Sequence, residues 1–212
     1  MVTGVQTCAL PISMASTIYV DKVDPASGTA LEIGTSGDTI TVPSGATFNV
    51  AGTFQSGGAA LANTPSFGAT ASSTQSISNG GFVKVVLDSE DWDTDSAFDS
   101  STNYRFTVPT GAGGKYLFNY GAYLVSMTTN GYFQLQLYKN GSELRESAFR
   151  TYMSASATSS MNITSSICVS LAAADYIEFY VIQDNSDGGG GSRTLSDSNY
   201  KPFLTGMKVI GA

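Results

Sequence analysis

The chain has 212 residues, of which 42% are hydrophobic, 11% aromatic and only 13% charged, and its formal net charge is −7. Charged residues thus make up about half their usual share in soluble domains, and small polar residues are abundant, which favours a β-rich extracellular or virion protein. The negative charge argues against nucleic-acid binding, which needs a basic surface, and no apolar run approaches the roughly eighteen residues of a membrane-spanning helix.

The first residues of the chain look unlike the rest. Residues 2–12, which read VTGVQTCALPI, look like the in-frame translation of a sequencing-library adapter. A signal peptide is the competing interpretation, but no Lys or Arg precedes the apolar residues, and residues 8–12 are too short for a signal-peptide core. We expect residues 1–13 to be an artefact of read assembly, with Met14 near the natural start or inside a longer reading frame.

Short alternating apolar pairs separated by glycine turns characterise residues 17–62. The pairs recur every eight or nine residues and are Leu31-x-Ile33, Ile40-x-Val42 and Phe48-x-Val50. One short strand per turn cannot bury its apolar face alone, so such a segment gains stability by stacking on copies of itself. We predict a thin β-repeat shaft over 14–62, which resembles the shaft of many phage tail fibres. A flexible Gly/Ser linker is the alternative.

From residue 63 onward the alternating units lengthen, and the pattern predicts one antiparallel sandwich over 63–212. Large rings at alternate positions of 115–126 indicate a strand with one buried face. Asn140-Gly141 predicts a tight hairpin turn. No segment has sustained helical periodicity, so the regular spacing favours an all-β sandwich or jelly roll. The predicted strands are Phe82–Leu87, Tyr104–Val108, Lys115–Ser126, Tyr132–Tyr138, Met161–Leu171, Tyr176–Gln183 and Phe203–Ile210.

Rings also occupy both faces of a predicted strand. Tyr132, Phe133 and Tyr138 cannot all point into one core, because adjacent strand residues face opposite ways. Part of this surface is therefore expected to be buried between subunits.

The cysteines predict no intrachain disulfide. Cys8 lies in the suspected artefact, which leaves Cys168 alone. In 162–171 the odd-numbered positions are mostly apolar and Cys168 falls on the other face. We expect Cys168 to be a buried small hydrophobic residue, with a reactive thiol as the alternative.

Catalytic chemistry has few candidates. The chain contains no histidine, which excludes Ser–His and Cys–His nucleophile pairs and imidazole zinc ligands. Paired carboxylates could still hydrolyse glycosides, and acidic residues are most concentrated in 88–99. Within this stretch we expect Trp92 and Phe98 to anchor the core and the acids to form a solvated turn between them. No catalytic residue is predicted, and the chain is expected not to be an enzyme.

The same stretch begins like a calcium loop, with the spacing Asp91-x-Asp93-x-Asp95. It then departs from the pattern, because Ser96 stands where glycine is needed and Thr102 where a bidentate Glu belongs. We therefore expect these aspartates to cap turns and expect no cofactor or metal, with an irregular Ca²⁺ site as the alternative.

Small polar loops are the candidate ligand contacts. One follows a predicted strand and is rich in glycine; another is a short tip between two strands. A mobile solvated tip is the alternative to a loop that contacts a ligand. The candidate ligand-binding residues are Asp184, Asn185, Ser186, Asp187, Thr128, Thr129 and Asn130.

Several short motifs follow one another along the chain, and their residues are Phe106, Pro109, Tyr116, Phe118, Asn140, Gly141, Asp175, Phe203 and Gly206. In this order they resemble the signature of the trimeric jelly-roll heads shared by complement globular heads and tumour-necrosis-factor-like proteins. Two features depart from that signature: Ala174 stands where the family usually has glycine before Asp175, and the link 110–114 is longer than usual.

The resemblance implies a homotrimeric binding head. With the fibre-like shaft before it, the chain is expected to be a virion tail-fibre or receptor-binding tip that attaches to a host surface glycan or protein, without nucleic-acid binding or membrane insertion. A secreted or cell-surface trimeric head of a bacterium is the alternative, which would be extracellular. A glycan-cleaving tailspike is the third possibility.

Overall fold

The computed structural model describes residues 31, 33–34, 36–52, 54–56, 59–60, 63–127, 131–153, 159–185, 190–196 and 200–209. The chain divides into two compact units, residues 1–51 and residues 52–212.

The described residues of the first unit form turns and irregular chain, and the short strands predicted there are absent. All six side chains of the apolar pairs from Leu31 to Val50 are exposed. The physical reason is that one apolar pair per turn supplies no neighbouring strand to pair with. The role of residues 14–62 as a shaft stays a prediction.

The second unit begins with a small two-stranded hairpin, β1 (Gln55–Ser56) and β2 (Ala59–Ala60).

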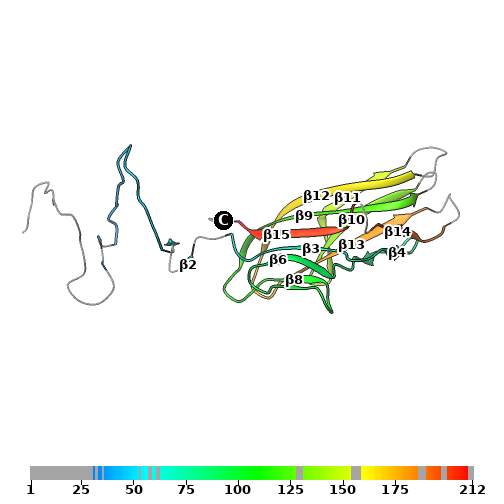
Figure 1. Cartoon of the computed structure of the whole chain (residues 1–212), viewed down its shortest axis with the longest axis horizontal. Helices are drawn as coiled ribbons and strands as arrows, with labels where there is room; N and C mark the ends of the chain where they lie inside the picture. The colour runs from blue at the N-terminus through cyan, green and yellow to red at the C-terminus, as the bar shows by residue number, and fades with distance from the viewer. Residues whose placement is uncertain are drawn as a thin grey trace, which may run out of the picture. The chain divides into compact units, whose positions relative to one another are not determined.

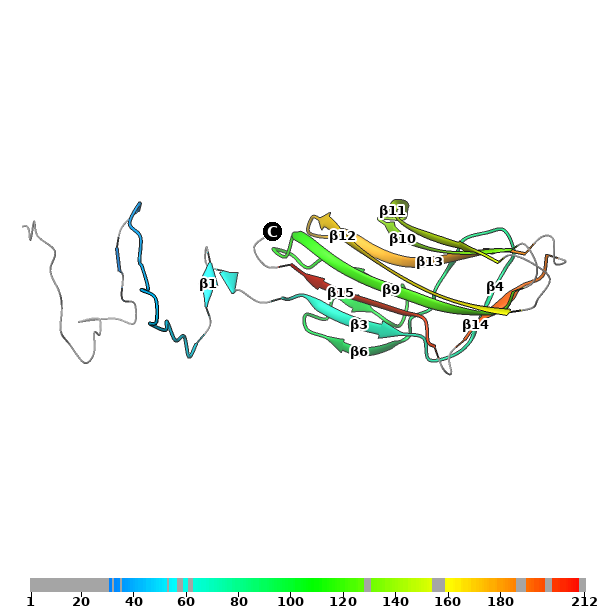
Figure 2. The same cartoon turned by 90° about the horizontal axis from the view of Figure 1, so that it is seen from above.

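Two antiparallel sheets build the rest of the second unit, and they lie face to face (Figures 1 and 2). The seven-stranded sheet contains β3 (Ser66–Thr70), β4 (Gln75–Ile77), β6 (Ser89–Asp93), β9 (Gly114–Met127), β12 (Ser159–Leu171), β14 (Arg193–Leu195) and β15 (Phe203–Lys208). The six-stranded sheet contains β5 (Val83–Lys84), β7 (Phe98–Asp99), β8 (Arg105–Thr107), β10 (Tyr132–Lys139), β11 (Ser142–Tyr152) and β13 (Tyr176–Asp184).

Eight of these strands follow the connectivity of a jelly roll. In one sheet the order is β3-β15-β9-β12, and in the other it is β8-β13-β10-β11. Counted along the chain, the first of the eight therefore lies beside the last and the second beside the seventh, which is the nested double Greek key of a jelly roll. The predicted all-β jelly-roll sandwich is confirmed.

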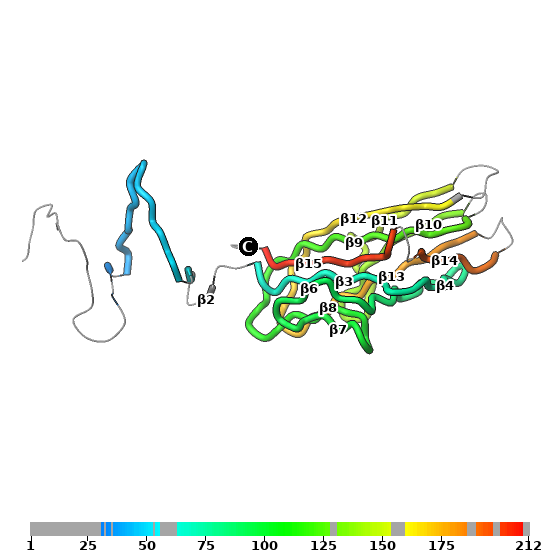
Figure 3. The backbone as a smooth tube through the Cα atoms, viewed as in Figure 1, coloured from blue at the N-terminus to red at the C-terminus, as the bar shows by residue number. Residues whose placement is uncertain are grey.

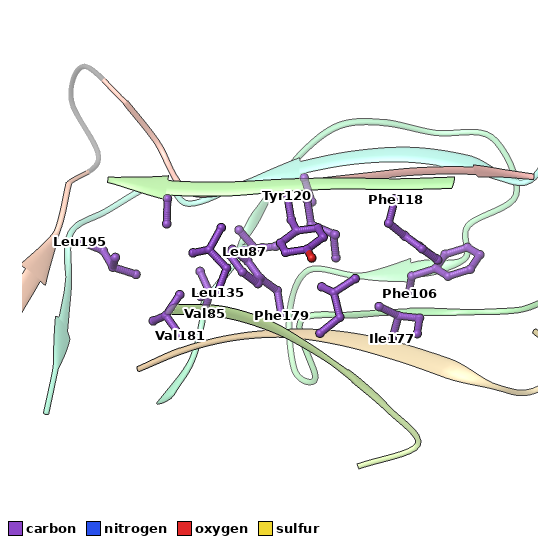
Figure 4. Packing of buried hydrophobic residues seen from close by; sticks show 14 of the residues in the cluster. Val85, Leu87, Phe106, Phe118, Tyr120, Leu135, Ile177, Phe179, Val181 and Leu195 are labelled. Atoms are coloured by element: carbon purple, nitrogen blue, oxygen red, sulfur yellow. The ribbon is translucent and has the colours of Figure 1, made fainter. Parts of the chain in front are cut away.

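The core between the sheets is aromatic at one end and mostly aliphatic towards the other (Figure 4). Phe67 stacks on Phe98 and Phe106, with ring centroids 4.9 and 4.8 Å apart, and Phe118 lies 5.9 Å from Phe106. The predicted alternation in β9 is observed, because Tyr116, Phe118 and Tyr120 are all fully buried. The packed rings of Phe67, Phe98, Phe106 and Phe118 come from both sheets, so they hold the sandwich together.

The hairpin between β10 and β11 forms as predicted at Asn140-Gly141. Asn140 has φ 52° and Gly141 has φ 76°, the left-handed pair that a tight hairpin turn requires. The returning strand β11 was not predicted, nor were β3, β4, β6, β7 and β14. The other predicted strands are all present, with ends that differ by a few residues.

Two predicted burial states are wrong, those of Trp92 and Cys168. Trp92 is 46% exposed, because it lies over Gly68 on the outward face of the seven-stranded sheet, whereas Phe98 is buried as expected. Cys168 is exposed, since the outward face of β12 has no second layer over it. As predicted, rings occupy both faces of β10: Phe133 points into the core, and Tyr138 points outward, where its ring centre lies 4.1 Å from that of Tyr180 with the planes tilted by 33°.

The turn before β13 is built without glycine. Ala174 has φ 67°, the left-handed conformation that glycine adopts most easily. Asp175 secures this turn: its carboxylate accepts hydrogen bonds from the Ala172 N–H at 2.8 Å and from the Asn140 amide at 2.7 Å. It also pairs with Lys139 at 2.8 Å. Side-chain contacts thus offset the strain at Ala174.

These contacts predict an acid-sensitive contribution to stability. Lys139, Asn140 and the Ala172 N–H lower the pKa of Asp175 from 3.8 to about 2. Because the folded pKa is depressed, this stabilisation is present in full above the unfolded pKa and is lost as the pH falls towards about 2. Asp175→Asn is expected to lower stability at neutral pH and to reduce the loss between pH 4 and pH 2. Urea unfolding at each pH measures both effects, and an unchanged acid loss in the variant would contradict them.

Among the described residues, no helical stretch has the length and hydropathy that a membrane crossing requires.

Candidate functional site

The strand ends place several connections at one end of the jelly roll (Figure 3). β9, β11 and β13 end there, and β10 and β12 begin there. In the ladders, Met127 lies opposite Ser159, and Tyr132 lies opposite both Tyr152 and Asp184. We call this the distal end. The chain enters β3 at the opposite end, where Ser66 pairs with Met207.

Two of the predicted ligand-binding residues are described. Asp184 is half-buried at the end of β13, on the outward face. Asn185 is fully buried; its backbone N–H donates to the Asn79 side chain at 2.7 Å and its carbonyl accepts from Gly190 N–H at 3.1 Å. The Asn185 side chain lies beneath the surface, so its direct contact with a ligand stays a prediction. Thr128, Thr129, Asn130, Ser186 and Asp187 lie outside the described residues.

The flanks of these predicted loops lie close together. A Cβ added to Gly131 would meet the Asp184 carbonyl at 2.6 Å, so the chain leading into β10 passes directly beside the end of β13. Gln183 supports the same region from below, since its buried amide donates to the carbonyls of Ile77 at 3.3 Å and Gly191 at 3.1 Å. The structure therefore brings the ends of the 128–130 and 186–189 connections to one place, as a recognition surface built from both would need.

Sequence reasoning missed a polar aromatic cluster at the distal end. On the outward face of the six-stranded sheet, the Arg150 guanidinium carbon lies 4.0 Å from the centre of the Tyr132 ring. The Tyr152 ring lies beside both, with its centre 6.0 Å from that carbon and 5.9 Å from the centre of the Tyr132 ring. Arg150 and Tyr152 are two residues apart on β11, which is the one signal in the sequence that they share a face.

The acidic stretch is occupied by local hydrogen bonds. The Asp93 carboxylate accepts from the Phe98 N–H at 2.8 Å, and Asp99 accepts from the backbone N–H groups of residues 101–103. The hydrogen bonds to Asp99, of which the one from the Thr102 N–H contributes most, hold the pKa of this carboxyl well below its usual range. Both aspartates thus cap turns as predicted. In the part of the chain that the structure describes, no three acidic or cysteine side chains gather as metal ligands would.

A shallow depression of about 440 Å³ lies near the opposite end, between residues 95–99 and 107–110. Asp99 is among its lining residues, and its carboxylate is already engaged by the backbone N–H groups of residues 101–103. We find no arrangement in it that suggests a reaction.

Comparison with known proteins concerns the fold. No family model matches the chain, and no curated protein matches it. Among solved structures it is similar to the globular domain of zebrafish complement 1qA protein, with a TM-score of 0.43, 13% identity, and coverage of 68% of this chain and 97% of that one. It is similar to Eiger TNF from S. frugiperda (0.45, 17%, 69% and 92%) and to PRD1 vertex protein P5 (0.45, 17%, 70% and 99%). The class of the protein, a two-sheet jelly-roll module, follows from its own strand order.

Proposed function

We propose that this chain is the head of a homotrimeric phage tail-fibre or receptor-binding protein that attaches a virion to a host surface. The observation that carries the proposal is the gathering of strand connections at the end opposite to the one where the chain enters β3. A head built in this way presents its connections away from its attachment point. Connections can vary without disturbing the packed strands, so they are suited to recognition.

Composition supports an uncharged or weakly charged partner surface. Only 13% of residues are charged, and hydroxyl, amide and aromatic side chains are abundant. Such groups bind sugars and polar peptide surfaces better than polyanions. Three weak sites on one trimer would act together by avidity, so each site needs only modest affinity.

Trimer formation is supported by the outward face of the seven-stranded sheet. Trp92 is 46% exposed and Met207 is 37% exposed on this face. The Phe203 ring lies close over Gly121, and the Tyr123 and Tyr200 rings lie 5.0 Å apart. Exposed apolar side chains gathered on one face are typical of a protein interface. This face, rather than the strand β10 considered from sequence, is our candidate contact between subunits.

Light scattering on the full chain is expected to give about three times the 22.1 kDa mass of one chain. Trp92→Glu places a charge on the apolar face and is expected to lower the mass towards that of a monomer. Thr110→Glu adds the same charge to an exposed turn and is the matched control. A stable monomer at micromolar concentration would contradict the trimer.

Two alternative functions are tested differently. A trimeric head secreted or displayed by a bacterium would be encoded next to a secretion signal rather than next to tail genes. A glycan-cleaving tailspike would release reducing sugars from host polysaccharide. The absence of histidine and the turn-capping roles of Asp93 and Asp99 favour binding over cleavage.

The test of the proposed function is adsorption of the fluorescently labelled chain to a panel of intact bacteria. We expect saturable binding to a subset of strains, displaced by unlabelled protein, without release of reducing sugar. Binding to no strain, or equal unsaturable binding to all, would contradict host recognition.

A further inference from the structure

The cluster of Tyr132, Arg150 and Tyr152 at the distal end combines a positioned cation with an exposed aromatic ring. The Arg150 guanidinium lies over the Tyr132 ring at 4.0 Å, and its Nη1 donates to the Tyr152 hydroxyl at 3.3 Å. The two rings are tilted by 58° with centroids 5.9 Å apart. Tyr152 is 66% exposed, so one ring of the cluster offers most of its surface to solvent.

Buried polar groups fix the position of Arg150. Its Nε donates to Gln134 Oε1 at 2.7 Å, and Gln134 is only 7% exposed. The Gln134 amide donates to Gln136 Oε1 at 3.0 Å, and Gln136 in turn donates to Ser147 Oγ at 3.3 Å. A chain of hydrogen bonds thus runs from Ser147 on β11 through two buried amides to the guanidinium. A satisfied network of this kind is rigid, so it orients the charged group.

Arg150 differs from the cations that have a structural partner. In the described ranges, Lys84 pairs with Glu178 and Lys139 pairs with Asp175, and neither ion pair includes Arg150. Its hydrogen bonds to Gln134 and Tyr152 use Nε and one N–H of Nη1. The remaining N–H groups have no acceptor among the described residues. A guanidinium offers these groups in the fork that matches a carboxylate.

We propose that Tyr132, Arg150 and Tyr152 bind the carboxylate-bearing sugar of a host surface glycan. The free side of the Arg150 fork receives the carboxylate, and the exposed face of Tyr152 packs against the C–H groups of the sugar ring. This inference rests on the proposed adhesion function and names its ligand class.

The charges around the cluster favour one isolated carboxylate over a polyanion. The net charge of the chain is −7, and Asp184 lies directly across the ladder from Tyr132. A dense polyanion would meet repulsion from both, whereas a single carboxylate reaches Arg150 alone. The exposed ring favours a sugar over a bare acidic peptide side chain, because it adds an apolar contact beside the charge.

The test is a titration of the full chain in which saturation-transfer NMR measures binding. The ligands are three acidic sugars, the methyl glycosides of glucuronic, galacturonic and N-acetylneuraminic acid. We expect at least one to bind, and its neutral counterpart (for the uronides, the methyl hexoside) to bind more weakly. Arg150→Gln is expected to weaken binding of the acidic sugar by about 10-fold or more, since a charge-assisted hydrogen bond is lost. Arg145→Gln removes the same charge from an exposed position on the same strand and should leave binding unchanged.

Tyr152→Ala separates ring contact from charge. It is expected to weaken both the acidic and the neutral sugar, whereas Arg150→Gln weakens the acidic sugar alone. Circular dichroism and thermal unfolding of each variant show whether it is folded. The inference is overturned if none of the three sugars binds, if neutral counterparts bind equally well, or if Arg150→Gln binds like the wild type. An Asp- or Glu-containing peptide that binds equally tightly through Arg150 would overturn the sugar assignment.

Cell adsorption distinguishes this inference from the function on which it rests. If the labelled chain adsorbs to bacteria and Arg150→Gln adsorbs equally, adhesion stands and the sugar site is wrong. If acidic sugars bind through Arg150 but no strain is recognised, the site stands and the adhesion function is wrong.

Discussion

Phe118→Ala is expected to lower the free energy of unfolding by about 3–5 kcal/mol, the range for removing a fully buried phenylalanine. Phe118 has no exposed surface, and its ring lies within 6.3 Å of the ring centres of Phe67, Phe106 and Tyr116. These neighbours come from both sheets, so they cannot close around the cavity without shifting a sheet. Urea unfolding measures the loss, which is large against the whole stability of a typical domain.

The matched control for this prediction is Phe149→Ala. Phe149 is the same residue type on β11, but it is 45% exposed, so truncation removes less buried surface and leaves no closed cavity. Equal losses for the two variants would mean that the ring cluster around Phe118 does not hold the sheets together.

Gly206→Ala is expected to lower the free energy of unfolding by about 1–3 kcal/mol. A methyl group at Gly206 would lie 2.6 Å from the Phe67 ring and 2.7 Å from the Phe118 ring. Phe67 is already held between Phe98 and Phe106, so it cannot retreat without displacing the stack. The cost is therefore one of overpacking, measured by urea unfolding.

Gly81→Ala is the control for Gly206. A methyl group there meets nothing within 4 Å. Its stability is expected to stay within about 0.5 kcal/mol of the wild type, as for other surface substitutions. A loss at Gly81 comparable to that at Gly206 would show that backbone freedom, and not crowding by the rings, explains both.

The sequence predicts the core strands well because burial leaves a strong signal. In β9, rings at every second position fix both the strand and its buried face, and Asn140-Gly141 fixes the following hairpin. The strand β11 was missed because it forms an edge of the six-stranded sheet and pairs only with β10. An edge strand can be polar and charged, so it carries little alternation. The hairpin turn itself implied a returning strand there.

The two wrong predictions of burial concern residues on the outward face of a sheet, because the sequence does not show which face of a strand points outward. Trp92 is large and apolar, yet its ring packs over Gly68 of the neighbouring strand, on the outward face of the sheet. Cys168 lies on the outward face of β12, and whether such a face is covered depends on what packs against it. Alternation says which residues share a face, and it does not say which face meets the core.

The candidate site was predictable in location and not in detail. Glycine-rich and small polar segments indicated connections, and strand pairing brings their flanks together at one end. The cluster of Tyr132, Arg150 and Tyr152 depends on the pairing register of β10 with β11, which includes an irregularity between Leu135 and Leu137. No pattern within either strand alone specifies that register.

The central claim is that the distal end recognises the host, and one measurement tests it most directly. A variant that lacks Gly188 and Gly189 and carries Asp184→Ala and Asp187→Ala is compared in cell adsorption with the wild type; it keeps the hydrogen bonds of Gly190 and Gly191 to Asn185 and Gln183. Glu143→Ala with Glu146→Ala removes two carboxylates from exposed positions of β11 and is the matched control. We predict that the distal variant keeps the mass and melting temperature of the wild type but loses adsorption, while the control adsorbs normally. Unchanged adsorption by the folded distal variant would contradict the account.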